Sequence, residues 1–259
     1  AEKQMINTFH RVGTGPHSVL VLHGWFGDAR AFASLEPALD GNRFTYVFMD
    51  YRGYGHMQAI AGEYTIDEIA QDALALADAL GFETFSLIGH SMGGMVIERI
   101  AMLAPKRVRM LIPVAPVPCC GVKFDADRRG LFERAIGQVE ARQAIIDRST
   151  GNRLPETWTR SMADYSWRNS SSTAFGAYLN AWSKSDFSAR VHGARYPVHV
   201  LIGEYDPTFN SDLMRATYLA WYPGATLEVL SNAGHYPTHE VPLALAASIE
   251  RNLQQGERG

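Results

Sequence analysis

Short apolar runs alternate with longer amphipathic stretches along most of the 259-residue chain. Apolar runs bounded by turn residues are typical of buried strands, and apolar residues spaced three and four positions apart are typical of helices. We predict strands at residues 18–22, 44–49, 84–88, 108–114, 198–202 and 226–230. We predict helices at residues 65–80, 92–103, near 211–221 and at 242–253. This alternation favours a parallel sheet with helices on both faces.

The alternation breaks between residues 119 and 190, where helical pieces and polar loops occur without a convincing strand. We interpret 119–190 as an inserted helical cap, and 1–118 with 191–259 as the core domain. The cap has 11 Lys plus Arg and 8 Asp plus Glu, so its net charge is +3 while the remainder carries −6. The simpler interpretation is that these charged residues are scattered over the surface. The alternative is that the segment forms a basic lid over a site for acidic substrates.

The overall composition is that of a globular protein, with 46% hydrophobic and 20% charged residues and a net charge of −3. This balance lacks the excess of positive charge that is typical of proteins that bind nucleic acid or an acidic membrane. The two cysteines, Cys119 and Cys120, are adjacent and have no other partner, which is typical of a reduced protein. No apolar run is long enough for a membrane span, and the first ten residues lack the pattern of a signal peptide. We therefore expect a cytoplasmic protein.

The strongest chemical signal is the sequence Gly-His-Ser-Met-Gly-Gly at residues 89–94, which follows a predicted strand and opens a predicted helix. A G-x-S-x-G turn in this context presents its serine, here Ser91, above the sheet as a nucleophile. Gly89 and Gly93 keep side chains out of the crowded turn, and the helix N-terminus favours negative charge there.

Ser91 needs a base, and the base needs an acid to orient it. His235 follows the strand at 226–230, so it opens onto the same edge of the sheet as Ser91. His239 is the alternative base. Asp206 follows the strand at 198–202 and is the predicted acid, with Glu204 and Asp50 as competitors.

Backbone N–H groups of Trp25 and Met92 are predicted to form an oxyanion hole, because Met92 follows the nucleophile and Trp25 lies in the loop after the first predicted strand. The residues predicted to contact substrate are His23, Gly24, Phe26 and His90. The spacing of His235 and His239 occurs in zinc helices, but the rest of that motif is missing. No phosphate-binding loop or dinucleotide motif is present, so we predict neither a metal nor a cofactor.

Four sequence features resemble the α/β-hydrolase superfamily, in the same order along the chain: His23 to Gly27, Asp50 to Gly55, Gly89 to Gly94, and the pair Asp206 and His235. The resemblance is greatest to small capped bacterial esterases, lactonases and C–C hydrolases. It implies an eight-stranded, mostly parallel sheet with a helical lid. His56 departs from the small serine that many relatives have there, and Ser91 excludes the relatives that use an aspartate nucleophile.

The candidate triad and the resemblance lead to the hypothesis of a serine esterase acting on a small-molecule ester. The near-neutral charge argues against a nucleic acid partner, and the sequence does not specify an oligomeric state. Lactonase, thioesterase or amidase activity would use the same residues, and C–C bond hydrolysis is a further alternative, although His90 replaces the asparagine common in that group. Two other hypotheses stay open. One is cofactor-free oxygen or peracid chemistry, and the other is a ligand sensor that signals through the cap.

Overall fold

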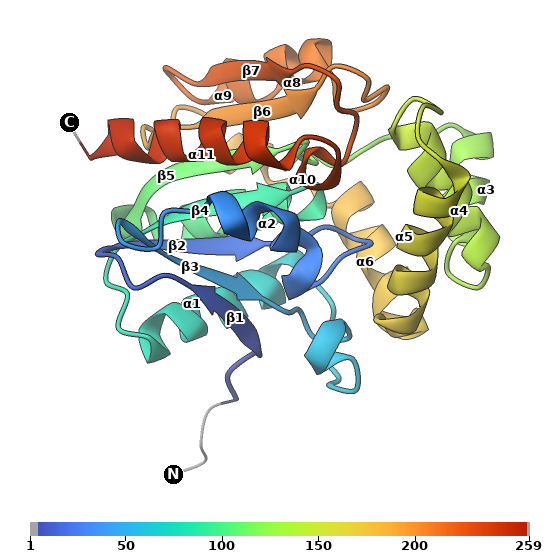
Figure 1. The fold of residues 1–259 in the computed structure, drawn as a ribbon, viewed down its shortest axis with the longest axis horizontal. Coiled ribbons are helices and arrows are strands. Elements are labelled where there is room, and N and C mark those ends of the chain that lie inside the picture. The colour runs from blue at the N-terminus through green and yellow to red at the C-terminus, as the bar shows by residue number, and fades with distance from the viewer. Residues whose placement is uncertain (1–4, 258–259) are drawn as a thin grey trace.

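A seven-stranded sheet forms the centre of the computed structural model, which describes residues 5–257 (Figure 1). The strand order is β1-β3-β2-β4-β5-β6-β7, and all neighbours are parallel except β1 and β3. The strands are β1 (Phe9–Val12), β2 (His17–Leu22), β3 (Phe44–Met49), β4 (Phe85–His90), β5 (Val108–Val114), β6 (His199–Gly203) and β7 (Thr226–Leu230).

Helices connect the parallel strands and pack on both faces of the sheet. They are η1 (Ala29–Ala38), η2 (Gly55–Met57), α1 (Ile66–Ala79), α2 (Met92–Leu103), η3 (Pro105–Arg107), α3 (Ala126–Arg134), α4 (Val139–Ser149), α5 (Glu156–Arg168), α6 (Ser172–Lys184), α7 (Ser188–Val191), α8 (Ser211–Ala216), α9 (Tyr218–Trp221), α10 (Pro237–Glu240) and α11 (Pro242–Gly256). Between residues 5 and 257, no helix combines the length and apolar character needed to cross a membrane.

The sheet has two separate hydrophobic faces because successive side chains of a strand point to opposite sides. Leu20 and Leu22 of β2 join a cluster with α1 and α2, whereas Val19 and Val21 join one with η1 and α11. All residues of β3 and β4 are buried. The predicted α/β architecture with helices on both faces is thereby confirmed.

Two details of the predicted fold are wrong. The described residues form seven strands rather than the eight implied by the resemblance, and they include β1, which the apolar pattern did not predict. β1 is a largely exposed edge strand, defined by its antiparallel pairing with β3 rather than by burial. The helix predicted near 211–221 is broken into α8 and α9 at Thr217, whose φ of −118° and ψ of −94° are not helical.

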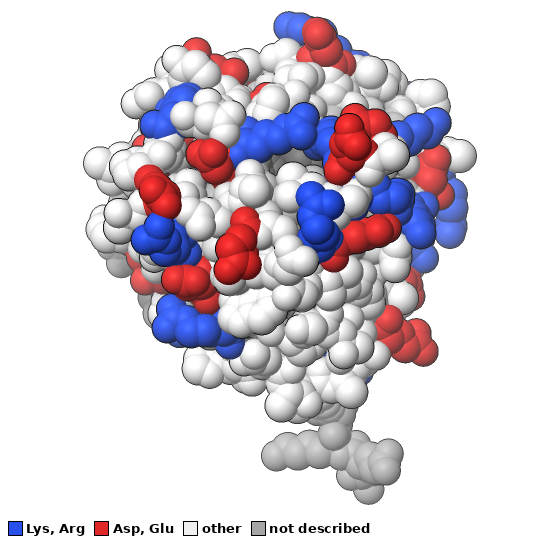
Figure 2. All heavy atoms as spheres, turned by 90° about the vertical axis from the view of Figure 1, so that its right-hand side faces the viewer, with Lys and Arg blue, Asp and Glu red and all other residues white. Residues whose placement is uncertain are grey.

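The segment 119–190 lies between β5 and β6 and contains α3 to α6, at the right of Figure 1. Its end falls within α7, so the predicted boundary at residue 190 cuts a short helix. On the face that carries these helices, basic and acidic side chains are interspersed (Figure 2). The charge of +3 in this segment therefore does not form one broad basic surface there.

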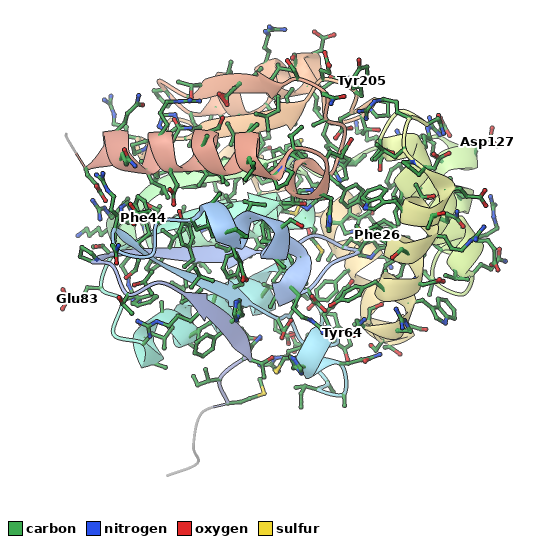
Figure 3. All side chains as sticks on the ribbon, viewed as in Figure 1. Phe26, Phe44, Tyr64, Glu83, Asp127 and Tyr205 are labelled. Carbon is green, nitrogen blue, oxygen red and sulfur yellow. The ribbon has the colours of Figure 1, made fainter. Side chains whose placement is uncertain are left out.

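The loop after β2 packs against this segment and so links it to the sheet. Trp25 donates its indole N–H to the carbonyl oxygen of Phe175 at 2.8 Å, and the two rings stack at 3.9 Å. The buried carboxylate of Asp28 accepts a hydrogen bond from Tyr165 of α5 at 2.7 Å. Phe26 lies at the same junction, whereas Glu83 points away from the molecule (Figure 3). The end of β2 is thus fixed against α5 and α6.

Glu98 of α2 is a buried acid whose ionisation opposes folding. Its Oε1 accepts a hydrogen bond from Tyr222 at 2.6 Å, and the residue is fully buried. Burial raises the pKa of its carboxyl to about 7, the hydrogen bond from Tyr222 opposing this shift. The unfolded chain ionises this group near pH 4.5, so the folded state holds an extra proton between these pH values. This contribution to stability is present below about pH 4.5 and is lost as the pH rises through 7.

We expect Glu98→Gln to gain stability relative to wild type by on the order of 2 kcal/mol between pH 5 and pH 8, because glutamine does not ionise. Urea unfolding at several pH values measures this difference. Glu83→Gln, at an exposed position, is the matched control and should follow the wild-type curve. Parallel curves for Glu98→Gln and wild type would show that Glu98 does not titrate in this way.

Candidate functional site

Ser91 lies in a tight turn between β4 and α2. Its φ of 56° and ψ of −115° are strained for a residue with a side chain. A Cβ added to Gly89 would lie 2.1 Å from the carbonyl oxygen of Gly93, and one added to Gly93 would lie 2.2 Å from that of Leu22. The turn therefore has no room for a side chain at Gly89 or Gly93, as predicted from the sequence. It projects Ser91 beyond the edge of the sheet.

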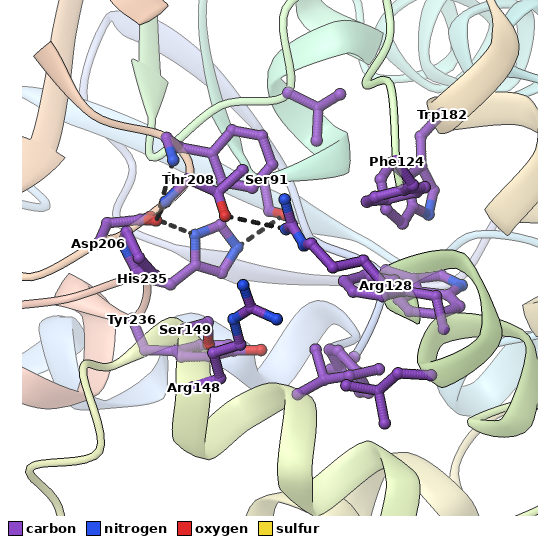
Figure 4. Close-up of a pocket in the computed structure, with 18 residues that line it drawn as sticks. Ser91, Phe124, Arg128, Arg148, Ser149, Trp182, Asp206, Thr208, His235 and Tyr236 are labelled. Atoms are coloured by element: carbon purple, nitrogen blue, oxygen red, sulfur yellow. Dashed lines mark hydrogen bonds and ion pairs between the residues drawn. The ribbon is translucent and has the colours of Figure 1, made fainter. Parts of the chain in front are cut away.

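A continuous chain of hydrogen bonds joins Ser91, His235 and Asp206 (Figure 4). His235 Nε2 lies 3.0 Å from Ser91 Oγ, and His235 Nδ1 lies 2.7 Å from Asp206 Oδ2. Ser91 follows β4, Asp206 follows β6 and His235 follows β7, and these three loops open at the same edge of the sheet. With Asp206 ionised, Nδ1 carries the imidazole proton and Nε2 is free to accept the proton of Ser91.

Asp206 is held by its backbone surroundings. Its second oxygen, Oδ1, accepts hydrogen bonds from the N–H groups of Thr208 and Phe209, both at 3.0 Å. The ring of Phe209 stacks on the imidazole of His235 at 5.1 Å. These two residues position the acid and the ring, and no sequence motif distinguished them.

The loop that carries His235 is clamped from several sides. His90 donates its Nε2–H to the carbonyl oxygen of His235 at 2.7 Å, and burial lowers the pKa of His90 to about 3, so that its ring is neutral. The N–H of His235 donates to the carbonyl oxygen of Ser149 at 3.1 Å. The carboxylate of Glu240 accepts hydrogen bonds from the N–H groups of Gly234 and Tyr236.

Glu240 also forms an ion pair with Arg153 at 2.9 Å, and its side chain is only 2% exposed. This acid therefore joins the His235 loop to the segment that follows α4. Sequence reasoning missed it because one acid in a short helix has no distinctive spacing.

We expect Glu240→Gln to lower the free energy of unfolding by about 1–3 kcal/mol, since an amide places N–H groups where buried donors need an acceptor. Chemical denaturation at neutral pH measures the loss. The exposed Glu83→Gln variant is again the control. If Glu240→Gln were as stable as this control, the clamp would contribute nothing measurable.

The competing candidates occupy other places. The carboxylate of Glu204 accepts the N–H of Asn232 at 2.8 Å, away from the imidazole. Asp50 accepts the N–H of Ala29 at 2.9 Å and the hydroxyl of Thr8 at 2.8 Å. His239 borders a small cavity beside Ser91, and burial lowers its pKa. His235 is bonded to Ser91 and Asp206, and these alternatives are not.

The two backbone donors predicted for an oxyanion hole lie on either side of Ser91. Met92 is the first residue of α2, so its N–H has no partner within the helix. Within residues 5–257, the N–H of Trp25 donates to no protein acceptor. A Cβ on Gly24 would lie 3.1 Å from the Cβ of Ser91, so the loop backbone approaches the serine closely.

Two cavities meet at Ser91. The larger contains about 620 Å³ of empty space including its open mouth, and its lining is mostly aromatic and aliphatic. The smaller is bordered by Gly24, His90 and His239. Four residues border both cavities: Trp25, Phe26, Ser91 and Tyr236.

His23 is the one predicted contact residue that borders neither cavity. Its ring is fully buried and stacks on Tyr51 at 3.7 Å. Its Nδ1–H donates to the carbonyl oxygen of Gly24, and its Nε2 accepts the N–H of Tyr51. The side chain therefore supports the loop from behind, and the geometry gives no support to a direct contact with substrate.

Two arginines that the sequence did not single out, Arg128 and Arg148, also line the larger cavity. The described residues contain no group of three or more His, Cys, Asp or Glu side chains arranged to hold a metal ion.

Residues 17–242 match the family model of the alpha/beta hydrolase fold. A 2-heptyl-3-hydroxy-4-quinolone dioxygenase from Rhodococcus erythropolis is 27% identical, over 93% of this chain and 92% of that protein. An esterase from Exiguobacterium antarcticum has a similar structure, with a TM-score of 0.84 at 19% identity, covering 95% of this chain and 94% of that one. A thermophilic esterase from Thermogutta terrifontis has a TM-score of 0.81 at 23% identity, covering 96% and 93%. The chain belongs to the alpha/beta hydrolase fold family.

Proposed function

We propose that the protein is a serine hydrolase that cleaves carboxylic ester bonds of small substrates through an acyl-enzyme. The observation that carries this proposal is the 3.0 Å contact between Ser91 Oγ and His235 Nε2, with Asp206 bonded to the opposite ring nitrogen. An alcohol is a weak nucleophile at neutral pH, and a neighbouring imidazole makes it an effective one.

In the first half of the proposed reaction, Ser91 Oγ attacks the ester carbonyl carbon while His235 Nε2 takes the hydroxyl proton. Asp206 stabilises the resulting imidazolium. The negative charge that develops on the carbonyl oxygen is stabilised by the N–H groups of Trp25 and Met92 and by the N-terminus of α2. His235 then gives its proton to the leaving alcohol, and the acyl group stays on Ser91.

In the second half, a water molecule enters and His235 removes its proton. The hydroxide attacks the acyl carbon, and the proton returns to Ser91 Oγ as the acid leaves. The same residues serve both halves, so no cofactor is needed for this route.

Hydrolysis of 4-nitrophenyl butyrate tests the proposal, because release of 4-nitrophenolate is seen directly. We expect turnover well above the buffer rate, with butyrate as the second product. Release of 4-nitrophenolate no faster than in buffer, for this ester and its acetate homologue, would count against ester hydrolysis.

The similarity to a quinolone dioxygenase over most of the chain supports a second candidate, cofactor-free oxygen chemistry. On this route, His235 with Asp206 would remove a proton from the hydroxyl group of a heterocyclic substrate, and dioxygen would be the second substrate. Ser91 would not act as a nucleophile. Oxygen uptake with 2-heptyl-3-hydroxy-4-quinolone, equal in wild type and Ser91→Ala, would favour this route over ester hydrolysis.

A further inference from the structure

Two positively charged side chains enter the larger cavity beside Ser91. Arg128 comes from α3 and Arg148 from α4, and both guanidinium groups point toward Ser91 and His235 (Figure 4). The rest of the lining is largely aromatic and aliphatic. Arg128 is partly buried, and a cation in mostly apolar surroundings is unfavourable unless something compensates its charge. Arg148 is exposed and adds a second positive charge at the same cavity.

No acid of the described residues forms an ion pair with either arginine. The Nη2 group of Arg128 donates to the neutral hydroxyl of Thr208 at 3.0 Å, and its Nε is buried without a hydrogen-bond partner in residues 5–257. Three other arginines of the same segment do have acidic partners: Arg129 pairs with Glu133, Arg153 with Glu240 and Arg160 with Glu156. Two arginines without an acidic partner among the described residues therefore line the same cavity beside Ser91.

Arg128 is also held in place by its surroundings. Its guanidinium lies 5.3 Å from the ring centre of Phe124 and 6.0 Å from that of Phe132. Burial and the nearby charge of Arg148 both lower the pKa of Arg128. The nearest carboxylate along the bond network is Asp206, but Thr208, Phe209 and His235 already bond both of its oxygens.

The face of the molecule seen in Figure 2 shows no broad basic patch. Basic and acidic side chains are interspersed on the face that carries α3 to α5 (Figure 2). Of the basic residues in 119–190, Arg128 and Arg148 line the cavity beside Ser91.

We propose that Arg128 and Arg148 bind a carboxylate group on the substrate, so that the preferred ester is one that also carries a free carboxylate. This inference rests on the proposed function for its reaction, but the anion site itself is independent of the reaction. An arginine fork suits a carboxylate because both oxygens can accept parallel N–H bonds. Arg128 is hydrogen-bonded to Thr208, and Thr208 is hydrogen-bonded to Asp206. A substrate carboxylate bound at Arg128 would therefore lie close to the carbonyl group that reacts with Ser91.

The test compares two esters that differ in one charge: 4-nitrophenyl hydrogen glutarate, and the same compound with its free acid methylated. We expect wild type to prefer the anionic ester in kcat/KM by about tenfold or more, the value of one charge-assisted hydrogen bond. Arg128→Met should lower this ratio by about tenfold and Arg148→Met by less, since Arg148 is exposed. The ratio cancels any loss common to both esters.

Arg129→Met is the matched control, because Arg129 neighbours Arg128 on α3 and does not line the cavity. Its ratio should stay within about twofold of wild type, and Arg128→Lys should recover part of the ratio lost in Arg128→Met. A wild-type preference for the neutral ester, or an equal ratio in wild type and Arg128→Met, would overturn the proposal.

Calorimetric binding of glutarate to Ser91→Ala separates this inference from the proposed function. If wild type hydrolyses neither ester, the ester function fails, but glutarate binding that is lost in Ser91→Ala/Arg128→Met would still support the anion site. Equal binding in these two proteins, or no binding in either, would overturn it.

Discussion

Replacing Ser91 with Ala is expected to lower the kcat for 4-nitrophenyl butyrate by about 10⁴-fold or more. The reason is that the acyl-enzyme route begins with attack by Ser91 Oγ, and alanine has no nucleophile to replace it. The stability of the fold should change by less than about 1 kcal/mol, because the hydroxyl has His235 as its partner and alanine adopts the same strained turn. Steady-state kinetics and urea unfolding of the two proteins measure both effects.

Ser149→Ala is the matched control, since Ser149 lines the same cavity but donates its hydroxyl to the carbonyl oxygen of Ile146. We expect its activity to stay within about threefold of wild type. Activity of Ser91→Ala within about tenfold of wild type would contradict the mechanism. It would favour the oxygen chemistry or the ligand-sensor hypothesis instead.

Asp206→Asn is expected to lower kcat by about 10³–10⁴-fold, by analogy with other serine–histidine–acid sites. An amide at this position places an N–H group against His235 Nδ1, which favours the tautomer whose proton is on Nε2. That nitrogen then cannot accept the proton of Ser91. The amide also removes a negative charge that stabilises the imidazolium formed during the reaction.

Glu204→Gln is the control for the choice of acid, because Glu204 lies two residues away and bonds Asn232 rather than His235. Its kcat should stay within about threefold of wild type. The reverse result, with a large loss in Glu204→Gln and a small one in Asp206→Asn, would identify Glu204 as the functional acid.

The sequence predicted those parts of the fold and site that depend on local patterns. β3 and β4 are rich in apolar residues at successive positions because both of their faces are buried. Ser91 was recognisable because its turn needs glycines two residues before and after it. Asp206 and His235 could be selected because each follows a strand of a parallel sheet, whose carboxyl ends share one edge.

The remaining features depend on contacts between distant segments. β1 is mostly exposed and is defined by its partner strand. His23 sits in the loop that approaches Ser91, but its ring turns back against Tyr51. Arg128 enters the cavity, whereas Arg129, its neighbour in sequence, pairs with Glu133. No pattern along the chain distinguishes those two arginines.

The central claim is that Ser91 is a nucleophile activated by His235, and labelling with diethyl 4-nitrophenyl phosphate tests it without knowledge of the natural substrate. The reagent transfers a diethylphosphoryl group to an activated serine and releases 4-nitrophenolate. The mechanism predicts one group per chain, located on Ser91 by peptide mass spectrometry, no label in Ser91→Ala, and labelling slowed by about 100-fold or more in His235→Ala. An unlabelled wild type, a label on another residue, or equal labelling rates in wild type and His235→Ala would contradict it.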